Sequence, residues 1–473
     1  MLEFFWIIQN TFASWWKEVV ETASLTTNWI ISIIWLVALF AILITEKVDK
    51  TIVSVLIAGM LIFLQVFSNW DISWDSSQTV AFKFIYHNLD IFAFIIWMMI
   101  ISGIAKDSWV FSYVALRIAK RLKWNPIKLF FILSYMAFFM TVFISNIPTI
   151  IILAPIVILI TKKLDIPVLP YIIWIITFAN LWGAVTPISD PTTYYQATQL
   201  NLSFFQVITN TWLIMFLATI ISWSYLYLVF RKEFKEEPDL EFLNSIKPID
   251  YIKDKKELVV SIWILLLVII LILSKELIKT NFWIVLDNWS ITLFGAFLAV
   301  LFLKHNVSNI LSTKVDYATL FFFAGLFVVV GSLEHNWVIE IIAKELVEIS
   351  KNWNWQVQNN FLLLILTMGS AMLSVFIDNV PYNIAMVGTL QSFASSWLVS
   401  WWAWMALAWG LNSCTSIGWA GSPIGSACNV IALWQAEKSW VLVAFGKYLL
   451  IWVPLVLLNS AMAYAVLYFR YLG

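Results

Sequence analysis

Residues 178–193 read FANLWGAVTPISDPTT, and long apolar runs flank this stretch on both sides. Each of its two prolines lacks a backbone donor and clashes with the preceding turn, so a helix breaks here. Backbone groups freed by such a break are tolerated in a membrane only inside the protein or beside a water-filled cavity. Asp190 adds a carboxylate, which is costly in the membrane interior and therefore marks a candidate functional site. The alternative is that Asp190 caps the half-helix that follows it.

Composition assigns the chain to a broad class. Of its 473 residues, 62% are hydrophobic and only 12% are charged, which is typical of a polytopic membrane protein. We therefore expect a multi-pass protein that is integral to the cytoplasmic membrane and in contact with its lipid. The formal net charge is zero, so nothing favours a nucleic-acid partner. The two cysteines and three histidines have no metal-ligand spacing, and we expect no cofactor other than a coupling ion.

The apolar runs fall into two sets on either side of one long charged stretch, residues 231–257. Runs of about 20 residues can span a bilayer, whereas runs of roughly 10–14 suggest re-entrant pieces. We predict an N-terminal interfacial segment (1–28), a first transmembrane repeat (29–230), a cytoplasmic linker (231–257) and a second transmembrane repeat (258–473). The runs lie at about 29–45, 51–67, 89–105, 128–144, 148–160, 169–184, 204–230, 258–273, 282–303, 318–333, 360–377, 381–398, 401–417 and 441–469.

The two halves resemble each other in sequence. FMTVFISNIPTIIILAP (139–155) aligns with MLSVFIDNVPYNIAMVG (372–388), and WGAVTPIS (182–189) aligns with GWAGSPIG (418–425). Lysines and arginines on both sides of the first aligned segment indicate that it enters from the cytoplasm and turns back. Counting the runs onward gives the second half the opposite orientation. The predicted fold is an all-α polytopic membrane protein of two inverted repeats, each with a re-entrant hairpin and a broken transmembrane helix, a design that recurs in secondary transporters.

Four places interrupt the apolar pattern: SNIPT (145–149), TPISDPTT (186–193), DNVPY (378–382) and SIGWAGSPIGSACN (416–429). Each break exposes half-helix ends, whose N-terminal amides attract anions and whose C-terminal carbonyls attract cations. Asp190 and Asp378 are the two carboxylates in these breaks. The pattern predicts a site for a small anion with a coupling cation, or for a cation alone. Any single hydroxyl in the breaks is equally explained by helix packing or by bonding to a nearby carbonyl.

At these residues the chain resembles the ion transporter superfamily, and within it the branch of the arsenite-pump membrane subunit, the melanocyte P protein and citrate-transporter-like permeases. The segments that carry the resemblance include SNIPTIIILAPI (145–156), LWGAVTPISDP (181–191), SVFIDNVP (374–381) and IGWAGSPIGSACNVIA (417–432). The chain departs from the branch at Ser145, where an Asp usually precedes the Asn, and at Thr192-Thr193, where Pro-Asn usually follows. The resemblance implies two hairpins that meet near the membrane midplane and hold substrate and coupling ion. The residues it implies are Ser145, Asn146, Thr149, Thr186, Asp190, Asp378, Asn379, Ser422, Ser426 and Asn429.

The function expected from these patterns is secondary active transport of a small anion or oxyanion, citrate- or dicarboxylate-like or arsenite-like, by alternating access coupled to H⁺ or Na⁺. The first alternative is a Na⁺/H⁺ antiporter without an organic substrate, with a monovalent cation as the only partner. A membrane-embedded enzyme is a remote alternative, because no HExxH or GxSxG motif occurs. An arsenite-type chain would need a soluble ATPase partner, since no Walker motif occurs in the sequence. Dimers are common in related families, so a homodimer stays open.

Tryptophan is abundant where glycine is scarce. The chain has 29 Trp and 14 Gly, whereas glycine averages about 7% of soluble proteins. The family pattern has glycine at several positions where this chain has tryptophan, and a Gly-Gly pair is implied at both 182–183 and 418–419. Tryptophans at the membrane interface explain positions such as Trp401 and Trp402, but not Trp182 at a break. We hypothesise that many of these residues are glycine in the cell, through a genetic code that reads UGA as glycine.

Overall fold

The computed structural model of this protein describes most of the chain. The described residues are 27–45, 48–67, 76–108, 113, 117, 120, 126–163, 165–233, 255–303, 306–349, 353–376, 379–395, 399–422, 426–437 and 445–473. Their regular secondary structure is entirely helical, which confirms the all-α prediction. The predicted interfacial segment, most of the predicted linker and Asp378 lie outside the described residues.

Each predicted apolar run corresponds to a helix. The helices of the first half are α2 (Thr27–Thr45), α3 (Lys50–Phe63), α4 (Ser77–Tyr86), α5 (Leu89–Asp107), α7 (Pro126–Ile144), α8 (Asn146–Lys163), α9 (Val168–Gly183), α10 (Pro191–Gln199) and α11 (Phe204–Phe230). Those of the second half are α13 (Lys255–Phe282), α14 (Asn288–Leu303), α15 (Val307–Lys314), α16 (Tyr317–His335), α17 (Val338–Glu348), α18 (Trp355–Phe376), α19 (Asn379–Ser395), α20 (Trp401–Trp419), α21 (Ala427–Glu437) and α22 (Phe445–Tyr471). Five short helices, α4, α10, α15, α17 and α21, were not among the predicted runs.

Length and hydropathy identify the spanning helices. Among the described residues, five helices are long and apolar enough to cross a membrane, within α11, α13, α16, α18 and α22. The pair α4 and α5, bent by 48° at its break, is a further span if the two helices cross together, or a re-entrant loop otherwise. Shorter apolar stretches lie in other helices, α7, α8 and α9 among them, within the described residues. The long apolar helices agree with the predicted full spans, and the re-entrant and broken pieces stay a prediction.

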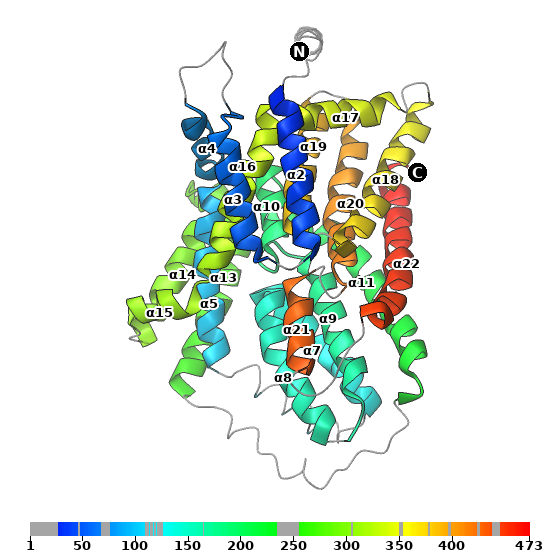
Figure 1. Cartoon of the computed structure of the whole chain (residues 1–473). Helices are drawn as coiled ribbons and strands as arrows, with labels where there is room; N and C mark the ends of the chain where they lie inside the picture. Colours follow the sequence, from blue (N-terminus) through cyan, green and yellow to red (C-terminus); the bar gives the residue numbers. More distant parts are fainter. Residues whose placement is uncertain are drawn as a thin grey trace.

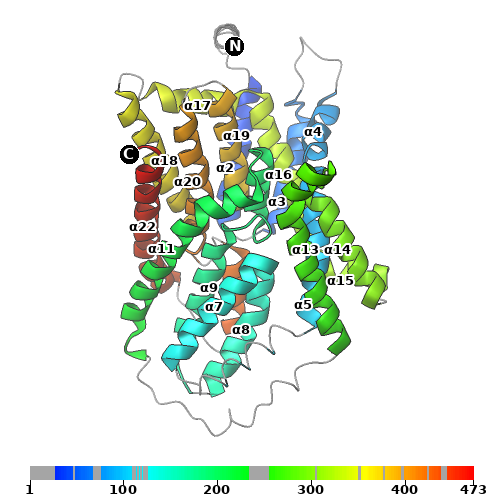
Figure 2. The same cartoon turned by 180° about the vertical axis from the view of Figure 1, so that it is seen from behind.

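The helices pair across the two halves of the chain. α3 packs on α16 and α5 packs on α14, while α10 packs on α19 and α21 packs on α8. Figure 1 shows the α7–α8 hairpin in the lower half of the molecule and α18, α19 and α20 in the upper half. Seen from behind, α5, α13 and α14 form one column beside the rest (Figure 2). These contacts between the two halves fit two repeats of opposite orientation. That orientation stays a prediction.

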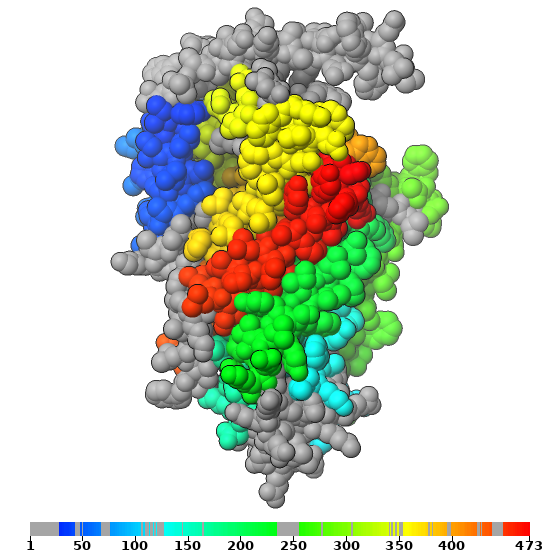
Figure 3. Space-filling view, turned by 90° about the vertical axis from the view of Figure 1, so that its right-hand side faces the viewer, coloured from blue at the N-terminus to red at the C-terminus, as the bar shows by residue number. Residues whose placement is uncertain are grey.

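The outer surface is apolar along the long helices. α11 and α22 pack against each other and run diagonally across the face in Figure 3, next to α18. Large apolar side chains such as Phe216, Leu228, Leu450 and Leu458 are exposed on these two helices. Contiguous exposed apolar surface on this scale marks a membrane-facing surface rather than a water-facing one. The helices inside this surface enclose the polar breaks.

Candidate functional site

The first hairpin turns at Ser145, the single residue between α7 and α8. The backbone angle φ of Ser145 is 104°, a value that residues other than glycine rarely adopt, so the backbone is strained at this turn. Asn146 is fully buried, and its Oδ1 accepts hydrogen bonds from Ile147 N (2.8 Å) and Ser145 Oγ (3.2 Å). Thr149 Oγ1 donates to the Ser145 carbonyl at 2.7 Å. The turn predicted at Ser145–Asn146 is therefore confirmed, and its own side chains stabilise it.

The first broken helix unwinds between Gly183 and Pro191. Thr186 Oγ1 donates to the Val142 carbonyl of α7 at 2.9 Å, which ties the break to the first hairpin. Asp190, only 1% exposed, caps α10 and accepts a hydrogen bond from Thr192 N at 3.3 Å. Thr192 Oγ1 donates to the second carboxylate oxygen. The capping alternative for Asp190 is thus confirmed, and it is compatible with a functional role.

The second hairpin contacts the first break through Asn379, the first residue of α19. Its Nδ2 donates to Asp190 Oδ2 at 3.4 Å and to Thr192 Oγ1 at 3.3 Å. Asn379 is fully buried, so these contacts are shielded from water by protein. Asp378, which precedes it, lies outside the described residues. The sequence-predicted Asp190 and Asn379, 189 residues apart, are therefore brought together.

The second broken helix is organised by Asn429 of α21. Its Nδ2 donates to the Trp419 carbonyl (2.9 Å) and to the Ser422 carbonyl (2.7 Å), and its Oδ1 accepts from Asn180 Nδ2 (2.8 Å). Ser426 Oγ donates to the other atom of the same amide, Asn180 Oδ1, at 3.4 Å. Ser422 Oγ donates to the Val375 carbonyl of α18. Ser422, Ser426 and Asn429 thus form one cluster, which contacts α9 through Asn180.

Several polar residues at this site were missed by the sequence analysis. Asn180 of α9 joins the second cluster, and Asn412 of α20 accepts from Thr193 Oγ1 (3.0 Å) while donating to the Ala184 carbonyl (2.9 Å). Gln196 Nε2 donates to the Ala408 carbonyl at 2.6 Å. Asn180 and Asn412 are amides inside apolar helices, which is the signal that could have identified them.

Four helices begin at this site: α8 at Asn146, α10 at Pro191, α19 at Asn379 and α21 at Ala427. The amide Nδ2 of Asn146 and the Oδ1 of Asn379 are buried and have no hydrogen-bond partner within the described structure. A Cβ added at Gly183 would lie 3.8 Å from Asn146 Nδ2 and 3.6 Å from Asp190 Cβ, so both side chains flank this glycine. The starts of α8, α10 and α19 and the unpaired atoms of Asn146 and Asn379 are therefore brought together beside Gly183.

The C-terminal carbonyls of helices that end at this site accept hydrogen bonds from side chains of the protein itself. α9 and α20 end at the site, and their last carbonyl groups point at side-chain donors. The Gly183 carbonyl accepts from Ser189 Oγ (2.6 Å) and Thr193 Oγ1 (3.2 Å). The Trp419 carbonyl accepts from Asn429, as described above. The carbonyl ends of these two helices thus accept internal hydrogen bonds, and the N-termini of α8, α10 and α21 are likewise capped, by Asn146, Asp190 and Ser426.

Two cavities flank the first break. The hairpin cavity, about 320 Å³, is lined by Ser145 and Pro148 of the first hairpin, by Ile188 and Pro191 of the break, and by α5, α15 and α16. The α13 cavity, about 510 Å³, is lined by Pro187 and Tyr194, by Lys275 and Lys279, and by the first turn of α5. The hairpin cavity lines α5 from Phe94 to Asp107, and the α13 cavity contacts that helix at Asp90. The two cavities therefore come within about one helical turn of each other near the start of α5.

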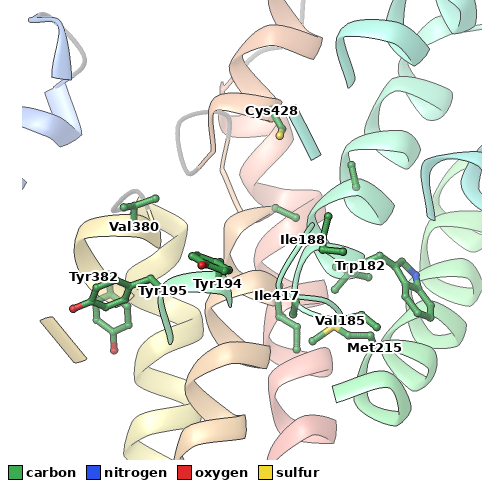
Figure 4. Close-up of a cluster of buried hydrophobic side chains, with 14 of the residues drawn as sticks. Trp182, Val185, Ile188, Tyr194, Tyr195, Met215, Val380, Tyr382, Ile417 and Cys428 are labelled. Atoms are coloured by element: carbon green, nitrogen blue, oxygen red, sulfur yellow. The ribbon is translucent and has the colours of Figure 1, made fainter. Parts of the chain in front are cut away.

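A stacked aromatic pair lies between the two cavities. Phe94 lines the hairpin cavity and Tyr194 lines the α13 cavity, and their ring centroids are 3.8 Å apart with an interplanar angle of 8°. Figure 4 shows Tyr194 among apolar side chains from both halves, with Ile188 and Val185 of the break and Ile417 and Val380 of the second half. Tyr194 and these neighbours therefore form an apolar shell beside the polar site.

The close packing of Gly418 at the second break predicts that a larger residue there lowers the stability of the protein. A Cβ at Gly418 would lie 2.1 Å from the Ala371 carbonyl oxygen of α18, so Gly418→Ala must push two helix backbones apart. We expect it to lower the free energy of unfolding by about 2 kcal/mol or more. Gly369→Ala on α18 is the matched control, because nothing lies within 4 Å of its added Cβ. Thermal unfolding of the purified protein in detergent measures both, and equal stability of the two variants would contradict this packing.

Comparison with known proteins agrees with this architecture. The sequence model of the citrate transporter family matches residues 40–411. The chain is 24% identical to the 46 kDa membrane protein of Mycobacterium leprae over 94% of this chain and 99% of that protein. It is 21% identical to the P protein of Mus musculus over 76% of this chain and 51% of that protein. These matches confirm the resemblance drawn from the sequence.

A solved structure shares the fold. MtrF of Neisseria gonorrhoeae, described as illuminating a class of antimetabolite efflux pumps, superposes with a TM-score of 0.52 at 11% sequence identity. The match covers 94% of this chain and 95% of that one. At this identity the similarity concerns the fold alone.

Proposed function

Because the chain belongs to the citrate transporter family, we propose that this membrane transporter moves a small anion or oxyanion by alternating access coupled to H⁺ or Na⁺. The observation that carries the proposal is a buried site where the starts of α8, α10 and α19 meet beside Gly183, with the start of α21 joined to α9 through Asn180. A helix N-terminus bears about half a positive charge and its free amides bind anions. The buried donor Asn146 Nδ2 adds a further contact for an anion. Internal hydrogen bonds occupy both the C-terminal carbonyls and the first amides of α8, α10 and α21, so Asn146 Nδ2 is the buried donor that remains for an anion.

The coupling ion needs a carboxylate and oxygen ligands. Asp190 supplies a buried carboxylate, and Asn379 supplies an unpaired Oδ1 next to it. A proton on Asp190, or Na⁺ between Asp190 and Asn379, would be held where the two halves of the chain meet. Either ion would alter the charge beside the anion site, which is the requirement for coupling. The hairpin cavity, lined by Pro191, and the α13 cavity, lined by Pro187, would supply two routes to this place.

Transport rather than an intramembrane reaction is the function that we assign. The curated relatives are named as transporters or membrane proteins, which points away from an enzyme. We propose the cytoplasmic membrane as the location, with the 231–257 linker in the cytoplasm. A Na⁺/H⁺ antiporter without an organic substrate is the second candidate, because Asp190 and Asn379 alone could serve it.

The test uses purified protein in liposomes loaded with a pH-sensitive dye. A sodium gradient is applied first without any anion, and then with citrate, a dicarboxylate or arsenite. We expect a pH or sodium response only when one of the anions is present, which would identify the substrate and the coupling ion together. A sodium-driven pH change of the same size without any anion would make the protein a Na⁺/H⁺ antiporter instead.

A further inference from the structure

One lysine lies in the wall of the hairpin cavity. Lys314 is the last residue of α15, and among the described residues that line this cavity it is the only one with a cationic side chain. Its aliphatic stem lies over Gly103 of α5, where an added Cβ would be 2.8 Å from Lys314 Cδ. The lysine side chain is 18% exposed. Because Gly103 has no side chain, the aliphatic part of Lys314 can lie directly against α5.

The ammonium group of Lys314 pairs with the carboxylate of Asp107, the last residue of α5. The Asp107 side chain is 49% exposed, and ion pairs that are this accessible to water contribute little to stability. The other carboxylate in the cavity wall, Asp316, is engaged as the N-cap of α16 and accepts from Thr319 N (3.2 Å) and Thr319 Oγ1 (2.6 Å). Asp107 is therefore the carboxylate that a bound anion would displace from Lys314.

The same cavity reaches the candidate site. Its remaining polar wall includes Ser145 of the hairpin turn, and Pro191 of its wall directly follows Asp190. We propose that Lys314 binds the carboxylate or oxyanion of the transported substrate in the hairpin cavity, in exchange for Asp107. The inference rests on the proposed function and names the substrate class as anionic. An ammonium on a flexible stem presents three donors to such a group without demanding a fixed geometry.

Two substitutions of opposite effect test this role. Lys314→Gln is expected to raise the KM for the anion about tenfold, because a hydrogen bond to a charged group is lost, and to change the maximal rate little. Lys314→Arg should retain a KM near that of the wild type. Asp107→Asn removes the competing carboxylate and should lower the KM. Lys162→Gln, at an exposed lysine outside both cavities, is the matched control.

The readout is initial uptake of the anion that the liposome experiment identifies, measured at several concentrations. If the wild-type protein moves no anion, the proposed function fails. If the wild-type protein moves an anion but Lys314→Gln and Asp107→Asn both keep its KM, the role of Lys314 is overturned while the proposed function stands.

A second inference concerns the buried tryptophans and rests on independent contacts. The ring centroids of Phe130 and Trp174 are 3.3 Å apart at an interplanar angle of 40°, closer than the roughly 4.5–7 Å at which aromatic rings pack. The indole nitrogens of Trp174, Trp419 and Trp452 are buried without a hydrogen-bond partner in the described structure, although a buried Trp N–H usually has one. Trp182 differs, because its Nε1 donates to Thr219 Oγ1 at 3.0 Å.

Trp419 also lies beside a close approach of α20 to α18. It follows Gly418, which is in contact with the backbone of α18 at Ala371. We infer that the residues at positions 174 and 419 are glycine in the cell, encoded by UGA that is read as glycine. The exposed Trp401 and Trp402, 63% and 62% accessible at the start of α20, show the contrasting environment of interfacial tryptophans.

The gene sequence and peptide mass spectrometry of the protein purified from its native cells test the second inference. We expect UGA at codons 174 and 419 and glycine in the corresponding peptides. UGG at both codons, or tryptophan in both peptides, would overturn it.

Discussion

Replacing Asp190 with asparagine is expected to lower the transport rate at least about 100-fold, a factor within the range attributed to a well-placed proton-carrying group. The protein should still fold and insert, because Asn and Asp are almost equivalent as helix N-caps. The side-chain carbonyl oxygen of the introduced asparagine can accept from Thr192 N, as the carboxylate does now. Asn379 can rotate its amide to accept from the new NH₂ group. The substitution therefore removes the charge and keeps the helix cap.

The matched control is Asp49→Asn. Asp49 caps α3 and accepts from Thr51 N and Ile52 N, but it is exposed and lines neither cavity. We expect wild-type transport from this variant. Rates are measured in liposomes at matched protein content, with thermal stability in detergent recorded for both variants. Near-normal transport by Asp190→Asn would mean that Asp190 is a structural cap alone, and the coupling ion would have to bind elsewhere.

Asp190 illustrates what could be predicted from the sequence. A carboxylate and two prolines within an apolar run have few physical explanations, so a helix break with a buried charge follows directly. The turn at Ser145–Asn146 was predictable because Pro148 and the polar residues before it interrupt an apolar run. The long apolar runs identified the helices because burial in lipid demands uninterrupted hydrophobicity over a known length. These are local properties, and they do not depend on which segments meet in space.

Contacts between the halves could not be predicted in the same way. Asn180 and Asn429 are 249 residues apart, and nothing in either local sequence names the other as its partner. Thr192, which contacts both Asp190 and Asn379, appeared in the sequence only as a departure from the family pattern. The short helices α10 and α21 escaped the hydropathy analysis because half-helices that lie inside protein need not be apolar throughout. The two cavities depend on the packing of several helices and have no local signature.

The stacked pair Phe94–Tyr194 suggests where the barrier between the two cavities lies. Alternating access requires that the two routes to the site never open together. Each of these rings lines a different cavity, and the two are in face-to-face contact. They come from α5 and α10, which pack on each other. Separating the rings would therefore connect the cavities, whereas their contact keeps water and ions from crossing beside Pro187 and Ile188.

Tyr194→Ala is accordingly expected to convert coupled transport into a leak. An aromatic pair contributes about 0.5–1.5 kcal/mol beyond its buried area, and a barrier lowered by about 1.4 kcal/mol raises a rate about tenfold. Decay of a proton or sodium gradient across the liposome membrane, without substrate, should therefore accelerate about tenfold. Tyr194→Phe keeps the ring and should hold the gradient as the wild type does.

Tyr195→Ala distinguishes a barrier from a general loss of packing. Tyr195 is the next residue of α10 and is buried to a similar degree, but it stacks on Phe327 of α16 at 5.7 Å and lines neither cavity. Both alanine variants remove the same volume from the same helix, so both should lose comparable stability. Only Tyr194→Ala should accelerate the leak. Equal leaks from the two variants would locate the barrier elsewhere, and the apolar shell around the break, rather than one ring pair, would then have to separate the two routes.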